Sequence, residues 1–158
     1  GCGMNEWQMP LIFIQRFDLD IILLAGRYTL LDHSGLAEFL PACVERDVKI
    51  TVGGPYNSGI LARDLSQPVT FNYEQAPDNL VNQARKLTDI CVAHDGDLKA
   101  AALQFVLAHP AVATAVPGVQ TIAELEQNIS MVEQEIPATM WSDMRAARLI
   151  PNDAPTPV

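Results

Sequence analysis

Apolar residues recur along the chain in two spacings, which predicts alternating helices and strands. Residues 6–17 and 36–46 carry apolar side chains three or four positions apart, as on one face of a helix, and Ser34 is suited to cap the second of these helices. Residues 21–25 form a short apolar run that is typical of a strand buried on both faces. Residues 48–52 are rich in β-branched side chains, which favours a second strand.

The second half of the chain continues this alternation. Helical spacing covers residues 80–91 and 97–108, and residues 112–116 form another short apolar run that predicts a third strand. Thr121 and Glu124 have the spacing of a capping box, which indicates the start of a further helix. A last helix is expected near the carboxyl terminus.

This order of elements predicts a single α/β domain over residues 1–158. Short apolar strands joined by helices imply parallel pairing, with any ligand site in loops at the carboxyl ends of the strands. Three strands and a possible fourth at residues 1–3 are too few to close a barrel. The segments 53–61 and 116–119 each follow a predicted strand and contain glycine, so both are candidate ligand-binding turns. The long stretch 54–76 is expected to be a binding loop or lid.

Composition narrows the possible partners. A net charge of −9, a pI near 4.6 and only ten Lys and Arg residues argue against nucleic-acid binding. We expect a cytoplasmic protein without membrane partners, because no uninterrupted apolar segment or signal-like start is present. The three cysteines and three histidines show none of the spacings of a disulfide framework or a metal site, so no metal is expected.

Three segments resemble a known family. Residues 23–31 read LLAGRYTLL, residues 53–61 read GGPYNSGIL and residues 116–118 read VPG. Together with Glu124 and Asn128, they closely resemble the carboxyl half of the aldo/keto reductases, and in particular the aldose 1-dehydrogenase branch with its L-fucose, D-threo-aldose and pyridoxal dehydrogenases. The resemblance extends over nearly the whole chain.

The resemblance implies a partial (β/α)8 TIM barrel, from the end of strand 5 to strand 8 and the terminal helices. It also implies an oxidoreductase that uses a nicotinamide dinucleotide. The family's catalytic Asp, Tyr, Lys and His lie on the first four strands, and no residue of this chain aligns with them. We therefore assign no catalytic residue and expect the isolated chain to be inactive.

The resemblance further implies contacts with the nicotinamide and pyrophosphate parts of the cofactor. Asn5 resembles the side chain that hydrogen-bonds the nicotinamide carboxamide, although an N-cap for the first helix explains it equally well. Tyr56, Asn57 and Ser58 belong to a loop that resembles the pyrophosphate cradle, with a purely structural turn as the alternative. Gly53 stands where a Tyr often stacks on the nicotinamide ring, so that ring face is left open or covered by Tyr56.

The last segment resembles the part of the family that holds the adenosine end of the cofactor. The contacts that it predicts are Gly118, Val119, Glu124, Gln127 and Asn128. A carboxylate at Glu124 would repel a 2′-phosphate and could accept a hydrogen bond from a free 2′-hydroxyl, so NAD is expected rather than NADP. A capping box alone is the alternative explanation for Glu124.

Three functions remain open at this point. The chain is a piece of an NAD-dependent aldose dehydrogenase, a module with weak dinucleotide affinity, or a half-barrel with a structural role. Tyr28 is the best candidate for a substrate contact, although aromatic residues at strand ends are more often core residues. Because an open barrel exposes sheet edges, we expect a homo-oligomer or pairing with a complementary half-barrel.

Overall fold

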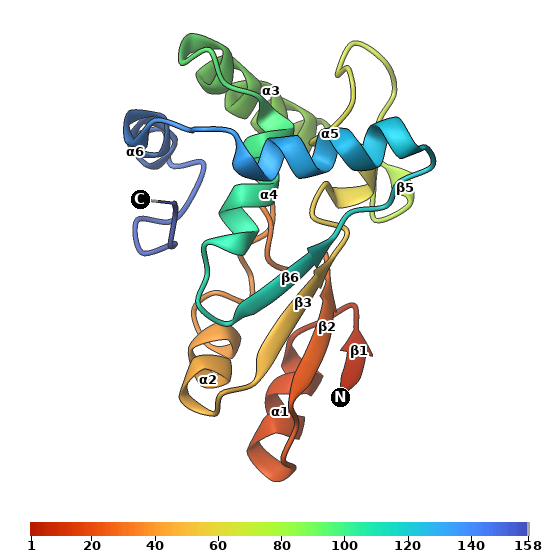
Figure 1. Ribbon diagram of the computed structural model, residues 1–158, viewed down its shortest axis with the longest axis vertical. Coiled ribbons are helices and arrows are strands. Elements are labelled where there is room, and N and C mark those ends of the chain that lie inside the picture. The colour runs from red at the N-terminus through yellow and green to blue at the C-terminus, as the bar shows by residue number, and fades with distance from the viewer. Residues whose placement is uncertain (158) are drawn as a thin grey trace.

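A four-stranded parallel sheet forms the centre of the computed structural model, which describes residues 1–157 (Figure 1). Its strands are β1 (Cys2–Met4), β2 (Ile21–Ala25), β3 (Lys49–Gly53) and β6 (Val112–Val116). They lie side by side in chain order, and every neighbouring pair is parallel. All carboxyl ends of the strands therefore lie at one edge of the sheet.

Helices connect the strands, and the predicted alternation is confirmed. The helices are α1 (Gln8–Arg16), α2 (Phe39–Glu45), α3 (Asp78–Ala93), α4 (Leu98–Leu107), α5 (Ile122–Glu133) and α6 (Ala138–Ala146). The expected helix at 36–46 begins later than predicted, and Ser34 does not cap it. Residues before Phe39 instead form a turn in which the Leu36 N–H donates to the His33 carbonyl.

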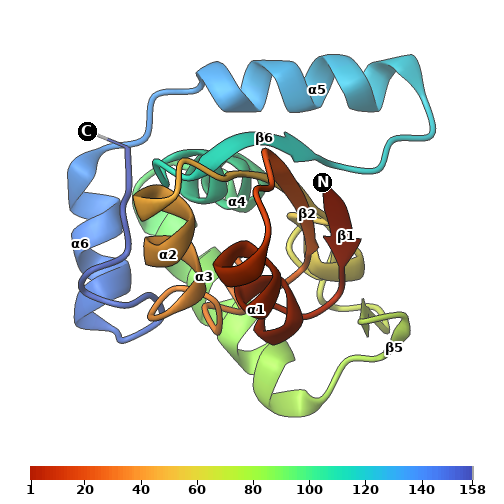
Figure 2. The same cartoon turned by 90° about the horizontal axis from the view of Figure 1, so that it is seen from below.

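One prediction about the sheet is wrong. Residues 21–25 were expected to be buried on both faces, yet only Ile22 and Leu24 are fully buried, while Ile21 and Leu23 are each 42% exposed. Helices α1, α2 and α4 contact one side of the sheet only, as seen along the strands in Figure 2. The other side, which we call the open face, carries Ile21, Leu23, Thr51, Thr114 and Val116, and no described element covers it.

The stretch after β3 contains more regular structure than expected. A short 3-10 helix, η1 (Asn57–Gly59), is followed by a hairpin of β4 (Thr70–Phe71) and β5 (Glu74–Gln75). Its two turn residues, Asn72 and Tyr73, have positive φ values of 52° and 68°, as a type I′ turn requires. The turn lacks the usual glycine, and this is why the sequence pattern did not predict a hairpin.

Most of the core lies between the sheet and its helices. Tyr28, Phe105 and Trp141 are buried there and pack in a row, with ring centroids 5.2 Å and 6.4 Å apart. Buried Gln104 on α4 donates from Nε2 to the carbonyl of Met131 at 2.8 Å and to that of Gln134 at 2.7 Å. The Gln104 side chain thus supplies a donor to two carbonyls at the carboxyl end of α5 and links that helix to α4.

Replacing Gln104 with Leu should lower the free energy of unfolding by about 2 kcal/mol, because two carbonyls at the end of α5 lose their donor in a buried place. Urea unfolding followed by circular dichroism measures the change. Gln8→Leu on the exposed surface of α1 is the control and should stay within about 0.5 kcal/mol of the wild type. An equal effect of the two substitutions would contradict the proposed tie between α4 and α5.

Candidate functional site

A cavity of about 630 Å³ lies at the carboxyl ends of β3 and β6. The two strands are parallel neighbours, with Gly53 beside Val116, so the segments that follow them leave the sheet side by side. One wall is the loop that leads into η1, and the other is the first half of α5 with the segment before it. The lining residues are Gly54, Pro55, Tyr56, Ser58, Gly59, Ala62, Arg63, Tyr73, Lys99, Gly118, Val119, Gln120, Glu124, Gln127 and Asn128.

The loop after β3 is tightly turned. The Asn57 N–H donates to the Gly54 carbonyl at 2.9 Å, and the Gly59 N–H donates to the Tyr56 carbonyl at 3.0 Å. Asn57 and Ser58 both have left-handed backbone, with φ values of 47° and 58°, which costs about 1 kcal/mol for each non-glycine residue. Backbone strain of this kind is common where a loop is shaped for a ligand.

A buried hydrogen bond joins the two walls of the cavity. The Tyr56 hydroxyl donates to Asn128 Oδ1 at 2.7 Å, and both side chains are less than 10% exposed. Burial, with a smaller contribution from the charge of Asp97, raises the pKa of Tyr56 to about 12. The phenol therefore stays protonated and keeps donating throughout the neutral pH range.

Ser58 connects the loop to the hairpin. Its Oγ accepts a hydrogen bond from the Tyr73 N–H at 3.2 Å, and its carbonyl accepts one from Thr70 Oγ1 at 3.1 Å. The Ser58 hydroxyl still has its own proton to donate. Tyr73 is 94% exposed and lines the cavity from the tip of the hairpin.

Two basic residues in the cavity were missed by the sequence analysis. Arg63 lies against the loop, and a Cβ atom at Gly59 would come within 2.9 Å of its Nε, so this glycine makes room for the guanidinium. Lys99, at the start of α4, donates from Nζ to Gln127 Oε1 at 3.0 Å. In the sequence, only the position of Arg63 close to the glycine-rich segment 53–61 could have indicated its role. Lys99 lies far along the chain from both segments 53–61 and 116–119, so no sequence signal indicated it.

Among the described residues that line the cavity, Glu124 is the only acidic one. Its carboxylate accepts a hydrogen bond from the Gln120 N–H at 2.7 Å, and its own N–H donates to Thr121 Oγ1 at 3.2 Å. The helix cap predicted for this position is therefore present. The cap also holds the carboxylate in place at the edge of the cavity.

The structure brings most of the predicted cofactor contacts to this one cavity. They are Tyr56, Ser58, Gly118, Val119, Glu124, Gln127 and Asn128. Asn57 lies behind the loop instead: it is 3% exposed, and its Nδ2 donates to the Gly26 carbonyl at 3.4 Å. Asn5 is exposed beyond the end of β1 and does not line the cavity, and it does not cap α1, because the N-cap residue is Trp7.

Tyr28 is a core residue rather than a surface for substrate. Its side chain is fully buried, and its ring packs 5.2 Å from that of Phe105 and 5.2 Å from that of His109. The prediction of a substrate contact at this position is therefore not supported, because the segment after β2 turns the ring into the helical layer.

Within residues 1–157, no three His, Cys, Asp or Glu side chains lie close enough together to hold a metal ion. None of the described helices has the length and apolar character needed to cross a membrane.

Comparison with known proteins places the chain among relatives more than twice its length. The profile of the aldo/keto reductase family matches residues 6–148. Pyridoxal 4-dehydrogenase from Microbacterium luteolum is 40% identical over 150 residues, which are 95% of this chain and 44% of that protein. D-threo-aldose 1-dehydrogenase from a Pseudomonas species is 41% identical over 139 residues, which are 87% of this chain and 42% of that protein.

A solved structure has the same fold. The holo form of an aldo-keto reductase from Bacillus halodurans superimposes with a TM-score of 0.72 at 24% identity. The match covers 92% of this chain and 48% of that one. The chain thus spans less than half the length of the relatives it matches.

Replacing Tyr56 with Phe should lower the free energy of unfolding by about 1 kcal/mol near neutral pH, because Asn128 loses its buried donor. The deficit should shrink at high pH. The pKa of Tyr56 is raised from 10.0 to about 12, so its contribution is complete below pH 10 and is lost as the pH rises to about 12. Urea unfolding at a series of pH values measures this.

Tyr73→Phe on the exposed hairpin tip is the control for this experiment and should leave stability unchanged at neutral pH. If the loss of unfolding free energy caused by Tyr56→Phe stays constant up to pH 12, burial does not raise the pKa of the Tyr56 phenol.

Proposed function

Because this chain belongs to the aldo/keto reductase family, we propose that it is the carboxyl-terminal half of an NAD-dependent oxidoreductase barrel, and that the cavity between β3 and β6 holds the dinucleotide. The observation that carries the proposal is the Tyr56–Asn128 hydrogen bond, which joins the turned loop to α5 in a single cavity. Both relatives named above are dehydrogenases, and nicotinamide dinucleotides are the cofactors of the family.

The residues of the cavity fit such a cofactor. Its volume is within the range of small-molecule sites. The Ser58 hydroxyl can donate to a phosphate oxygen, and Arg63 and Lys99 supply positive charge in the same cavity. These donors would hold the pyrophosphate, and the exposed ring of Tyr73 at the rim would limit the access of water to it.

Glu124 favours NAD over NADP in this proposal. Its carboxylate lines the cavity and accepts a hydrogen bond from the Gln120 N–H. A negative charge there repels a 2′-phosphate, whereas it can accept a hydrogen bond from the 2′-hydroxyl of NAD. Lys99 lies in the same cavity but is held by Gln127, so it only partly offsets this repulsion.

The reaction class proposed for the complete protein is oxidation of an aldose at C1. The bound cofactor would accept the hydride, and the chain's own residues would bind and orient it. The groups that move the proton are expected on the half-barrel that this chain lacks, so the isolated chain should not turn over L-fucose or D-arabinose. Turnover by the chain alone would overturn this part of the proposal.

Calorimetric titration of the chain with NAD and with NADP tests the cofactor assignment. NAD should bind more tightly. Glu124→Gln keeps an oxygen that can accept from the Gln120 N–H but removes the charge, so it should improve NADP binding by about tenfold, equivalent to about 1.4 kcal/mol. Glu126→Gln, which lies on α5 outside the cavity, should change neither affinity. Tighter binding of NADP to the unmodified chain would contradict the role of Glu124.

A second candidate function, that of a half-barrel which associates with another, is favoured by its apolar surfaces. The open face exposes Leu23 (42%) and Val116 (51%), and β1 and β6 are unpaired on their outer sides. Helix α5 exposes an apolar stripe beyond β6, formed by Ile122, Leu125, Ile129 and Val132. Helix α1, next to β1, exposes Met9 and Ile12.

These surfaces are arranged so that two half-barrels could close on each other. If β1 of one half pairs with β6 of another, α1 of the first comes beside the stripe on α5 of the second. The same contact at the opposite edge would close an eight-stranded parallel barrel around a two-fold axis. A second copy of this chain, or a complementary half-barrel, could fill this role.

Sedimentation equilibrium tests this association. We expect the chain alone to form a dimer or a larger species, and Leu23→Lys should shift it toward monomer, because a charge would be buried in the closed barrel. Val92→Lys, at a site on α3 that is 67% exposed, should leave the mass unchanged. A monomer at all concentrations would exclude association of identical halves.

A further inference from the structure

The tip of the β4–β5 hairpin presents an aromatic ring to the cavity at the ends of β3 and β6. Tyr73 lines this cavity and is 94% exposed, the highest exposure among the large hydrophobic side chains that the structure describes. A tyrosine ring usually buries much of its surface, because the ring is a large apolar group. An open ring at the rim of a cavity is a surface on which a flat ligand group can stack.

The backbone holds Tyr73 in a conformation that a bulky side chain rarely adopts. Its φ is 68° and that of Asn72 is 52°, so both turn residues are left-handed. Glycine commonly fills the second position of such a turn, where it has no side chain to strain. Strained residues of this kind gather at ligand sites, so the conformation agrees with a role for the Tyr73 side chain.

Two neighbouring loops hold the hairpin tip. The Tyr73 N–H donates to Ser58 Oγ at 3.2 Å, and Thr70 Oγ1 donates to the Ser58 carbonyl at 3.1 Å. From the loop after β2, Arg27 Nη1 donates to Asn72 Oδ1 at 3.5 Å. The Tyr73 ring is thus carried on a segment that is attached to two of the loops at the carboxyl edge of the sheet.

The hairpin and α5 bound the cavity from different sides. Figure 2 shows β5 on the side of the sheet where β1 lies, and α5 on the side of β6. A dinucleotide whose adenosine end lies at Glu124 on α5 therefore directs its other end toward Tyr73. That other end carries the nicotinamide ring.

No other described residue presents an open aromatic ring to this cavity. Tyr56 also lines it, but this side chain is only 9% exposed, and its hydroxyl donates to Asn128 at 2.7 Å. Gly53, at the end of β3, has no side chain to cover a ligand. Tyr73 is therefore the aromatic surface that remains for a flat ligand group.

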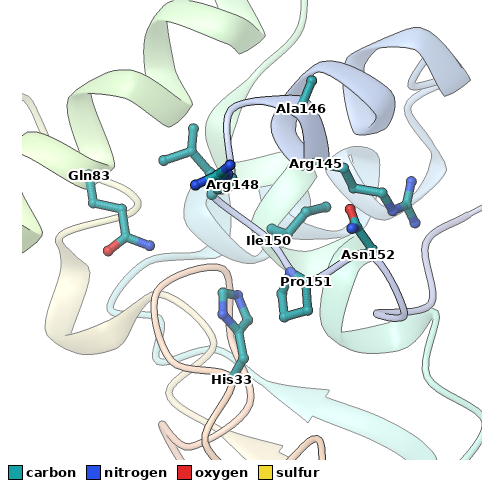
Figure 3. Close-up of a pocket in the computed structure, with 9 residues that line it drawn as sticks. His33, Gln83, Arg145, Ala146, Arg148, Ile150, Pro151 and Asn152 are labelled. Carbon is teal, nitrogen blue, oxygen red and sulfur yellow. The ribbon is translucent and has the colours of Figure 1, made fainter.

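A second cavity, of about 570 Å³, lies on the helical side of the sheet and offers no comparable surface (Figure 3). It forms where the loop after β2, helix α3 and the segment after α6 meet, and it shares no lining residue with the first cavity. Polar side chains such as those of His33, Gln83 and Arg148 line it, but no Phe, Tyr or Trp does so among the described residues. Stacking on a phenol ring is therefore specific to the first cavity.

From these observations we propose that the Tyr73 ring stacks on the nicotinamide ring of the bound cofactor. This inference rests on the proposed dinucleotide site and adds a contact to it. Aromatic rings attract each other through offset or edge-to-face contacts, which the sugar and phosphate groups of the cofactor cannot make. Tyr73 is therefore a cofactor contact that favours a complete dinucleotide over a fragment without the nicotinamide ring.

Calorimetric titration of the full chain with NAD and with ADP-ribose tests this contact, because ADP-ribose lacks the nicotinamide ring. Tyr73→Ala should weaken the binding of NAD about tenfold and leave that of ADP-ribose unchanged. Tyr73→Phe keeps an aromatic ring and should bind NAD as tightly as the unmodified chain does. Phe17→Ala, which removes a ring that is 61% exposed at the end of α1, is the matched control and should change neither affinity.

Tyr73→Gly separates the effect of the ring from that of the turn. Glycine relieves the positive φ, so this variant should keep or raise thermal stability while weakening NAD binding as much as Tyr73→Ala does. If Tyr73→Ala leaves NAD binding unchanged, or weakens NAD and ADP-ribose equally, the stacking contact is overturned while the dinucleotide site stands. If NAD does not bind to the unmodified chain, both the site and the contact are contradicted.

Discussion

The pairing of β3 with β6 is the constraint on which the candidate site depends. The two strands are parallel and adjacent, so Gly53 and Val116 end side by side although a long stretch of chain separates them. The glycine-rich loop and the start of α5 are thereby brought to one edge of the sheet. The bond from Tyr56 to Asn128 then fixes their separation. The two segments thereby enclose one cavity, which Ser58, Arg63 and Lys99 line with hydrogen-bond donors.

Because helices cover only one face of the sheet, apolar side chains remain exposed on the other face. Strands such as β2 are apolar on both faces, which suits a barrel in which one face packs on helices and the other fills the interior. In this chain the helices cover one face, and Ile21 and Leu23 remain partly exposed on the other. Stability therefore rests on the helical side, where the packed rings of Tyr28, Phe105 and Trp141 lie. The open face is the surface that the proposed partner half-barrel would cover.

Local patterns in the sequence predicted the local elements well. The strands at 21–25 and 112–116 have the expected bounds, and the capping contact at Thr121 is present. The family resemblance is confirmed, and the residues that it indicated after β3 and β6 line one cavity, with the exception of Asn57. These features are encoded within short segments, so they can be read without the tertiary structure.

Features set by tertiary packing could not be predicted in the same way. Exposure of Leu23 depends on what covers the sheet, and burial of Tyr28 depends on how the loop after β2 turns. Lys99 reaches the first cavity only because α4 begins beside α5. The second cavity combines segments around residues 33, 83 and 145–152, which share no sequence motif.

Nuclear magnetic resonance of the isotope-labelled chain during addition of NAD tests the central claim most directly. If the cavity between β3 and β6 holds the dinucleotide, backbone amide shifts should change in the loop from Gly54 to Gly59 and along the first half of α5. The amides around Arg148 and His33 should stay unchanged. Shifts confined to other parts of the chain, or none at saturating NAD, would contradict the account.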